Sequence, residues 1–198
     1  MLEERNTPKT LLAAAAPLFA TSGFNVVTIH QIAEAAKVNV ALISYYFGGK
    51  EGLYAAVLES QLCPLLQSLE TWRTNTSSLP VIEQLYLYVD TIFTQQRQQP
   101  FLSQLLLNEL IYPTACGQPL IQKYFDQSFQ CIHCIIEAGA RSGEFKPGLP
   151  VEYVKFIWYS VLNFHIANNI VNDLQVLNEY YTIQCVDMFL NGIIQKTF

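Results

Sequence analysis

Residues 28–54 read TIHQIAEAAKVNVALISYYFGGKEGLY, and this stretch decides the fold of the first part of the chain. Thr28, followed three residues later by Gln31, has the form of a capping box that starts a helix. Apolar residues at helical spacing form one face of that helix: Ile29, Ile32, Ala33 and Ala36. Asn39 can cap a second short helix, which we expect to end at Phe47 because two glycines follow it.

Two short helices joined by a tight turn are the layout of a helix-turn-helix, in which the second helix enters the major groove of DNA. A further helix is expected before this pair, because Thr7-Pro8 is a typical helix start and Gly23 a typical stop. Its apolar residues also recur at helical spacing: Leu11, Leu12, Ala15, Leu18 and Phe19. Pro17, inside this run, predicts a bend.

The composition favours a folded chain with extensive burial, since 51% of the 198 residues are hydrophobic and only 14% are charged. The net charge of −5 lies beyond residue 55, where seven basic residues face twelve acidic ones, while residues 1–55 carry four of each sign. Such a neutral N-terminal part is a weak electrostatic footprint for DNA. Affinity should therefore depend on a few well-placed contacts and on dimer symmetry.

The five cysteines form no small-domain disulfide framework, and the polar start of the chain does not read as a signal peptide. Polar residues interrupt every apolar run before it reaches the length of a membrane span. We therefore expect a cytoplasmic protein with reduced thiols and no association with membranes.

Beyond Lys50 the periodicity predicts helices, with a polar loop at residues 74–78 and no convincing strand or internal repeat. The expected helices lie at residues 50–73, 81–97, 101–111, 119–142, 151–171 and 177–195. The predicted fold class is all-α with roughly nine helices. We expect a three-helix DNA-binding domain at residues 1–50 and a ligand-binding and dimerisation domain at residues 51–198.

The last two expected helices are apolar on almost every side, which indicates burial on every side. A chain of this size has difficulty covering both, so we expect them to pack against a second copy as a four-helix bundle. The expected dimer interface is Trp158, Val161, Leu162, Val186, Phe189 and Leu190. The alternative, that both helices belong to the core of one chain, stays open.

Residues 11–54 resemble the DNA-binding domain of the TetR (tetracycline-repressor) family of bacterial regulators. The residues that carry the resemblance are spread in order along the stretch: Ala14-Ala15, Leu18-Phe19, Gly23-Phe24, Thr28, Ile32-Ala33, Ala36, Val38, Ile43, Tyr45-Tyr46-Phe47, Lys50-Glu51 and Leu53-Tyr54. The resemblance implies a homodimeric regulator that binds double-stranded operator DNA. It also implies that a small inducer, bound in the C-terminal domain, spreads apart the DNA-binding domains of the two subunits, each of which we call the reader.

Four positions are candidates for contacts with the DNA backbone. Thr28 lies at a helix start, which attracts anions, and Lys50 opens the helix after the glycine pair. We assign Tyr46 to a phosphate and Tyr45 to the groove edge. Lys37 stands in the turn where the family usually has glycine; with a positive φ it would cost about 1 kcal/mol, and it is either a further phosphate contact or a plain surface lysine.

Base reading should fall to the exposed early residues of the second short helix: Asn39, Val40, Ala41 and Ser44. Asparagine can pair with adenine, while valine and alanine can contact a thymine methyl group. This helix contains no arginine, so the commonest guanine contact is missing. The sequence therefore predicts an operator read by methyl groups and DNA shape as well as by hydrogen bonds.

The inducer is not identifiable from the sequence, but a small apolar or aromatic molecule fits the residues available in the C-terminal part. The candidate pocket residues are Tyr86, Phe93, Leu106, Glu109, Tyr112, Phe129, His133, Trp158 and His165. Aromatic residues at such spacing are more often core than ligand pocket. Glu109 and His165 are better candidates for a ligand contact than the aromatic residues, because a polar group in an apolar helix needs a partner.

Cys131-Ile132-His133-Cys134 has no second metal-ligating pair at zinc spacing, so we expect small thiols and neither a metal nor another cofactor. No set of nucleophile, base and orienting group can be assembled, so no catalytic residue is predicted. The alternative to a regulator is a helical small-molecule-binding or scaffold protein without sequence-specific DNA binding, which the neutral reader and the missing arginine leave open.

Overall fold

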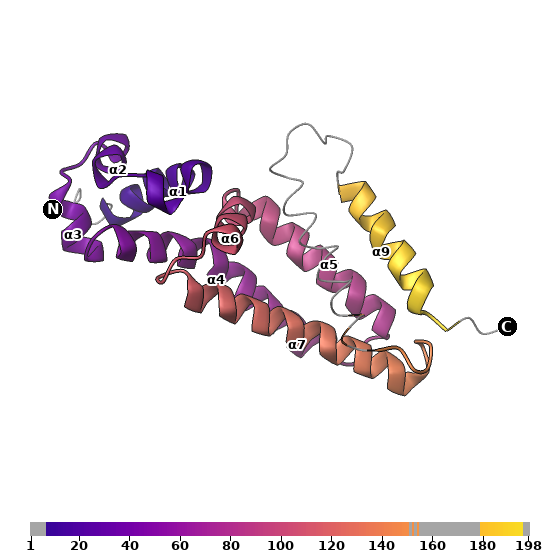
Figure 1. The fold of residues 1–198 in the computed structure, drawn as a ribbon. Coiled ribbons are helices and arrows are strands. Elements are labelled where there is room, and N and C mark those ends of the chain that lie inside the picture. Colours follow the sequence, from indigo (N-terminus) through magenta and orange to yellow (C-terminus); the bar gives the residue numbers. More distant parts are fainter. Residues whose placement is uncertain (1–6, 151, 153, 155–178, 196–198) are drawn as a thin grey trace. The chain divides into compact units, whose positions relative to one another are not determined.

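The computed structural model describes residues 7–150, 152, 154 and 179–195. In these residues the chain forms eight α-helices (Figure 1): α1 (Thr7–Val26), α2 (Ile29–Ala36), α3 (Ala41–Phe47), α4 (Lys50–Thr76), α5 (Val81–Gln98), α6 (Leu102–Ile111), α7 (Gln118–Ser142) and α9 (Glu179–Ile193). Extended pairing within the described ranges is limited to an isolated bridge between Phe145 and Ile194. The predicted all-α class is confirmed, and the helix expected at residues 151–171 lies outside the described residues apart from 152 and 154.

The predicted stop at Gly23 is a break in the helix, because Gly23 has the non-helical φ 76° and ψ 161°; the range of α1 continues to Val26 only across this kink. One local prediction needs correction. Helix α4 runs to Thr76, so the loop expected at residues 74–78 is partly helical.

The contacts divide the chain into two compact units, Met1–Pro64 with Gln99–Lys123, and Leu65–Gln98 with Tyr124–Phe198. Helices α4 and α7 each contribute residues to both units. The predicted boundary after residue 50 concerns function and stays a prediction.

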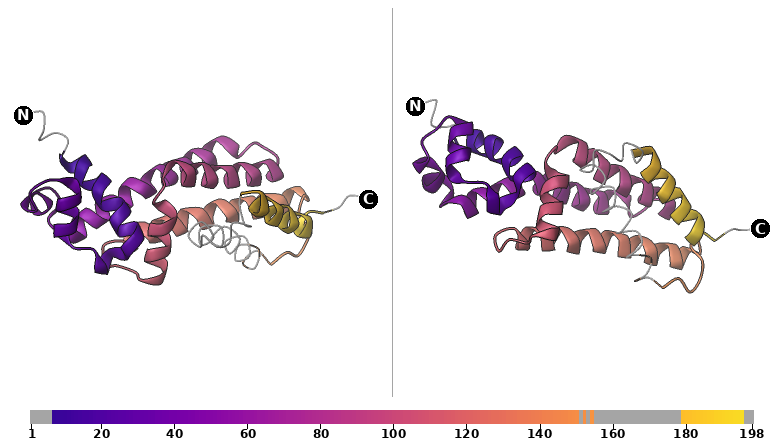
Figure 2. Two further views of the ribbon diagram at one scale, coloured as in Figure 1. Left: turned by 90° about the horizontal axis from the view of Figure 1, so that it is seen from above. Right: turned by 45° about the horizontal axis from the view of Figure 1, so that its top comes forward.

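In the first unit α1, α2, α3 and the beginning of α4 lie close together (Figures 1 and 2), and their buried side chains form a small apolar core. Its fully buried side chains come from all four helices: Leu11, Phe19, Ile32, Ile43, Leu53 and Tyr54. Phe19 and Tyr54 meet edge to face with ring centroids 4.8 Å apart, and Phe24 lies 4.9 Å from Tyr54. Aromatic pairs in such geometry add stabilisation beyond the area that they bury. This packed core therefore holds α2 and α3 in fixed positions.

Helix α6 belongs to the same unit and packs on α1. The side-chain amide of Asn108 donates to two α1 carbonyl oxygens, that of Phe19 at 3.2 Å and that of Ala20 at 2.9 Å. These carbonyls lie just before the kink at Gly23, where the regular helical conformation is broken. Asn108 therefore pairs with carbonyl oxygens next to the kink, where the helical conformation of α1 is interrupted.

The second unit contains the later part of α4 with α5, most of α7 and α9. Trp72 meets Tyr88 edge to face at 5.6 Å and donates its indole N–H to the Gln84 carbonyl oxygen at 3.2 Å. The Tyr88 hydroxyl shares a hydrogen bond of 2.5 Å with Ser128 of α7. These buried polar groups are paired, so they tie α4, α5 and α7 together without an orphaned donor.

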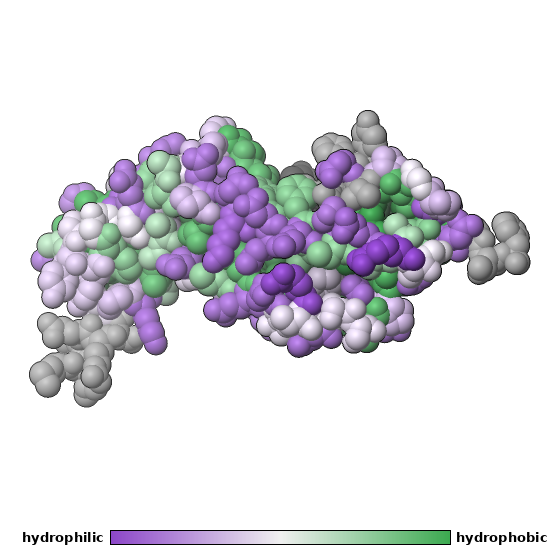
Figure 3. Space-filling view, turned by 90° about the horizontal axis from the view of Figure 1, so that it is seen from below, coloured by the Kyte–Doolittle hydropathy of each residue, from purple (hydrophilic) through white to green (hydrophobic). Residues whose placement is uncertain are grey.

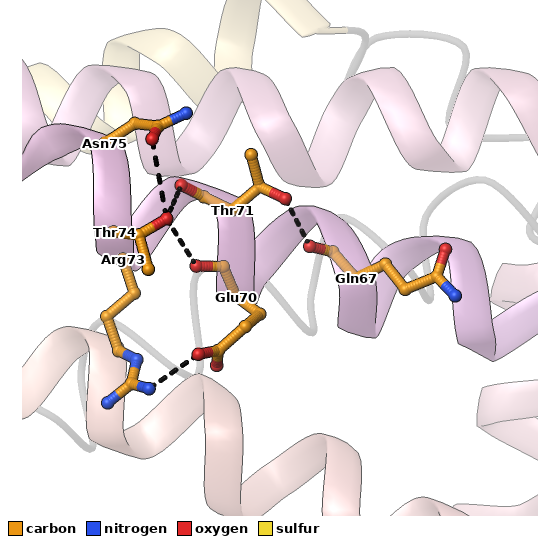
Figure 4. A network of polar contacts seen from close by, with 6 residues as sticks. All are labelled: Gln67, Glu70, Thr71, Arg73, Thr74 and Asn75. Carbon is orange, nitrogen blue, oxygen red and sulfur yellow. Dashed lines mark hydrogen bonds and ion pairs between the residues drawn. The ribbon is translucent and has the colours of Figure 1, made fainter.

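The solvent side of the α4 segment in this unit carries polar pairs within one helix (Figure 4). Arg73 forms an ion pair of 2.7 Å with Glu70, and Thr71 donates to the Gln67 carbonyl oxygen at 2.9 Å. Solvent screens such exposed pairs, so they add little stability. Figure 3 shows hydrophilic residues spread over one face of the molecule, as expected for helices with one side in water.

Candidate nucleic-acid interface

Helix α2 begins with the predicted capping box. The Gln31 amide donates to the Thr28 hydroxyl oxygen at 3.2 Å, and the Thr28 amide donates to the Gln31 side-chain oxygen at 2.8 Å. Both residues are exposed, so the helix start faces solvent. The box fixes the direction of the remaining free N–H groups, which is the arrangement that favours an anion at a helix N-terminus.

The turn after α2 places Lys37 at a positive φ, which is the condition under which a lysine here is expected to carry a conformational cost. This residue has φ 55° and ψ 42°, and within the described ranges it is the one non-glycine residue with positive φ. The Lys37 amide donates to the Glu34 carbonyl oxygen, and the Val38 amide donates to the Ala33 carbonyl oxygen, each at 3.0 Å. These bonds are those of a Schellman turn. The turn is therefore well satisfied, while the lysine backbone carries the cost of a left-handed conformation.

Asn39 caps the second short helix as predicted. Its side-chain oxygen accepts from the Ala41 amide at 2.9 Å, and Val40 between them already has helical φ −57° and ψ −30°, although the range of α3 starts at Ala41. The four predicted base readers share this helix start: Asn39, Ala41 and Ser44 are exposed, and Val40 is half-buried. Pairing with adenine needs the same Asn39 oxygen as an acceptor. Capping and base reading would thus share one oxygen, which can accept two hydrogen bonds.

Tyr45 and Tyr46 lie at the end of α3 with ring centroids 4.9 Å apart in an edge-to-face arrangement. Tyr45 is 78% exposed, whereas Tyr46 is half-buried. Their different exposure fits two different tasks. A fixed, half-buried phenol suits a positioning contact, and an exposed phenol is free to reach a groove edge.

Lys50 is the first residue of α4, and its ammonium group lies over the Phe24 ring, 4.5 Å from the centroid. A cation held above an aromatic face is attracted by the ring. Gly48 and Gly49, with φ of 73° and 127°, make the sharp entry into the helix. The positive end of the helix and the positive, half-buried side chain of Lys50 therefore lie at the same point.

Gly52 is a structural residue that the sequence did not reveal as special. A Cβ atom at this position would overlap the carbonyl oxygen of Phe47, at the end of α3. The close approach of α4 to α3 thus requires glycine. A glycine inside a helix, where alanine would be more stable, was the available signal.

The predicted pocket residues fall into both units. Leu106, Glu109 and Tyr112 belong to the first, whereas Tyr86, Phe93, Phe129 and His133 belong to the second. Phe93 and Leu106 are buried, but Tyr112 is 71% exposed and the Tyr86 hydroxyl donates to Asp187 of α9 at 2.7 Å. His133 is half-buried and lies 3.2 Å from Glu137. Trp158 and His165 lie outside the described residues, and the pocket stays a prediction.

Glu109 is buried, and the partners that it needs come from its own unit. Thr114 donates its backbone N–H at 3.1 Å and its hydroxyl at 2.8 Å to the two carboxylate oxygens. Burial, together with a hydrogen bond and the charge of Glu109, raises the pKa of Tyr54. A Cβ atom at Gly117 would overlap the same carboxylate. Glu109 therefore joins α4, α6 and the segment before α7.

Three of the six predicted dimer residues are in α9, and the other three, Trp158, Val161 and Leu162, lie outside the described residues. Leu190 is buried within the chain itself, and Phe189 is half-buried. Val186 belongs to the helix, but its surroundings are not described. The interface stays a prediction.

The segment Cys131–Cys134, in which the sequence predicted small thiols and no metal, lies on α7, with Cys131 buried and Cys134 exposed. Burial raises the pKa of the Cys131 thiol to about 12. A thiol with such a pKa stays protonated at neutral pH and is a poor nucleophile. Cys131 therefore behaves as a small apolar core residue.

No helix in the described part of the chain is long and apolar enough to cross a membrane. Residues 11–57 match the model of the family described as bacterial regulatory proteins, tetR family. This match covers α2 and α3 completely and reaches into α4.

Similar proteins agree with this match. The chain is 29% identical over 140 residues to the probable HTH-type transcriptional regulator YttP of Bacillus subtilis (strain 168), covering 71% of this chain and 68% of YttP. It is also 29% identical over 160 residues to the HTH-type transcriptional regulator RutR of Escherichia coli (strain K12), covering 79% of this chain and 72% of RutR. The crystal structure of HlyIIR, a hemolysin II transcriptional regulator, superposes with a TM-score of 0.68 at 27% identity, covering 97% of this chain and 99% of HlyIIR. Residues 11–57 therefore form a DNA-binding helix-turn-helix domain of the tetR type, and along most of its length the chain is similar to transcriptional regulators.

Proposed function

We propose that the protein is a homodimeric repressor that leaves a palindromic operator when a small apolar or aromatic ligand binds its C-terminal domain. The observation that carries this proposal is the geometry of α3. Its capped start presents Asn39, Ala41 and Ser44 to solvent, while Ile43 is fully buried behind them. An exposed, polar and methyl-bearing edge on a rigidly packed helix is what base reading in the major groove needs.

The backbone contacts are assigned to the residues that surround this edge. Thr28 and Lys50 each lie at a helix start, and Tyr46 is held half-buried beside the exposed Tyr45. Lys37 lies in the turn between the two helices, with its side chain exposed. We assign these residues to phosphate contacts and Tyr45 to the groove edge, because backbone contacts fix the register of the reader without reading sequence.

The low charge of the N-terminal part supports a dimer. Four basic and four acidic residues up to residue 55 leave little general attraction for DNA. Two readers linked in one molecule bind the second half-site with a high effective concentration, which compensates for weak single contacts. We assign the linkage to α9 and the apolar segment before it. Such a protein acts on the chromosome, and we therefore place it in the cytoplasm.

The linkage also explains how a ligand could release the operator. The two DNA-binding domains of a dimer fit one palindrome only when they are a fixed distance apart. A ligand that binds more tightly to a dimer with another separation therefore lowers operator affinity, by a factor set by the difference between its affinities for the two states. Repression requires only that the bound dimer obstructs transcription, and release by ligand then gives induction.

Sedimentation and DNA titration test this proposal together. The full chain should sediment as a dimer and bind a selected operator, and one or more compounds from a library of small apolar and aromatic molecules should weaken that binding at least tenfold. In a transcription reaction with purified polymerase, the protein should lower transcript yield from an operator-bearing promoter. A monomer that binds the operator equally well, or a rise in transcript yield, would contradict the proposal.

A further inference from the structure

A pocket with a volume of about 370 Å³ lies in the first unit, between the end of α1, the beginning of α4 and the end of α6. Its walls include Phe24, Val26, Tyr54, Asn108 and Tyr112. Pockets of this size are at the lower end of the range that binds small molecules. All of these residues belong to one compact unit, so the pocket is a property of the reader and its attached helix.

The kink in α1 creates this space. Gly23 lines the pocket with φ 76° and ψ 161°, and a Cβ atom built there would meet no atom within 4 Å. On the opposite side, Asn108 holds α6 against α1 through the Phe19 and Ala20 carbonyl oxygens. The break opens the wall of the first helix, and the amide bridge keeps the second wall in position.

The surface around the pocket is apolar for an exposed site. Val26 is 68% exposed and Tyr112 is 71% exposed, and both line the pocket. Exposed apolar side chains that gather at a concave site typically mark a binding site. None of the lining residues is charged: the polar groups are those of Thr21, Ser22, Asn25 and Asn108, with the tyrosine hydroxyls.

We propose that this pocket is a small-molecule site of the first unit that shares only Tyr112 with the nine residues expected to line the inducer pocket, and that it takes a small, neutral aromatic molecule. The Phe24, Tyr54 and Tyr112 rings offer flat apolar walls, and stacking of aromatic rings is favourable in such an arrangement. The hydroxyl and amide groups at the rim can pair with one polar group of the ligand. None of the lining residues supplies a negative charge, and the Lys50 ammonium group lies over the Phe24 ring, so a cationic ligand would lose its hydration without finding a counter-charge.

The test uses isotope-labelled full-length protein in the absence of DNA, with indole and benzamide as neutral probes. Their binding should shift the amide signal of Gly23 and the side-chain amide signals of Asn108 in a saturable way, with dissociation constants on the order of a millimolar or tighter. Benzylamine, of similar size but positively charged, should bind at least tenfold more weakly.

Two variants locate the site. Tyr112→Ala and Val26→Ser remove exposed walls, and each should weaken indole binding at least fivefold. Leu110→Ala is the matched control, because Leu110 is exposed on the same helix and does not line the pocket. A thermal melt of each variant checks that the fold is intact, and the two wall variants test the site independently of each other.

Three results would overturn the proposal: probes that leave the Gly23 and Asn108 signals unchanged, binding of benzylamine as tight as that of the neutral probes, or equal weakening by Leu110→Ala. Because the measurement contains no DNA, its failure is distinct from a failure of the repressor proposal. Operator binding and release by the library compounds would stand whatever the outcome at this pocket.

Discussion

Replacing Lys50 with methionine tests the proposed grip on the DNA backbone. Methionine keeps an unbranched side chain of similar length, and its sulfur can still pack on the Phe24 ring that lies 4.5 Å from the lysine ammonium group. The substitution therefore removes the charge and retains most of the packing. Lys50→Arg is the complementary variant, since arginine keeps the charge and also stacks on aromatic rings.

The expected effect follows from counterion release. Each phosphate neutralised by a protein contributes about −0.9 to the slope of log affinity against log salt concentration. Loss of Lys50 should reduce the magnitude of that slope by about 0.9 for one reader and about 1.8 for a dimer with both readers bound. The cation–π contact contributes roughly 0.5–1 kcal/mol at such a site and a sulfur–aromatic contact a similar amount, so folding stability should change by less than about 1 kcal/mol.

The assay is fluorescence anisotropy of a labelled operator duplex, titrated at several salt concentrations between about 50 and 200 mM. Lys50→Met should bind more weakly at low salt and approach the wild type at high salt, whereas Lys50→Arg should keep the wild-type slope. Lys123→Met, which removes an exposed lysine not assigned to DNA, is the matched control for net charge. An unchanged slope in Lys50→Met, or the same reduction in Lys123→Met, would refute the phosphate contact.

Three further substitutions test the frame. Gly52→Ala places a methyl group against the Phe47 carbonyl oxygen and should destabilise the chain by about 1–3 kcal/mol in urea unfolding; wild-type stability would show that α4 does not need this close approach. Lys37→Gly removes the left-handed strain at φ 55° but adds freedom to the unfolded chain, so a net stabilisation of about 0.5–1 kcal/mol is expected, and a loss would mean that the lysine side chain has a structural partner. Burial raises the pKa of Tyr124 to about 12, above the ordinary value of about 10, so its contribution to stability is complete below pH 10 and is lost as the pH rises from about 10 to 12. Tyr124→Phe should therefore reduce the alkaline loss of stability by up to about 2–3 kcal/mol, and an equal loss in both proteins would contradict that pKa.

The sequence predicted best what neighbouring residues determine. The capping box of Thr28 and Gln31 and the cap by Asn39 involve bonds over two or three residues. The turn at Lys37, where the sequence left the sign of φ open, involves bonds over three and five residues. The helix bounds from α4 onward were also predicted to within a few residues, because apolar periodicity and proline or glycine breaks are local signals. These features place the exposed edge of α3.

The contacts that distant residues make could not be predicted. Asn108 caps carbonyl groups of Phe19 and Ala20, 89 and 88 residues away in the chain, and no local pattern pairs them. Glu109 was correctly expected to need a partner. Its partners are Thr114 and Tyr54 of the same unit, which reach it because α6 packs beside the beginning of α4. Likewise, only the approach of α4 to α3 shows why residue 52 is glycine.

The central claim is that two copies of this DNA-binding domain, which has no net charge, together recognise a defined DNA sequence. Selection of duplexes from a random pool by the full-length protein, followed by sequencing of the bound fraction, tests the claim most directly. The account predicts a palindromic motif whose two half-sites contain thymines, contacted through methyl groups by Val40 and Ala41. Salt-sensitive binding without any enriched motif, or no binding even at low salt, would contradict it.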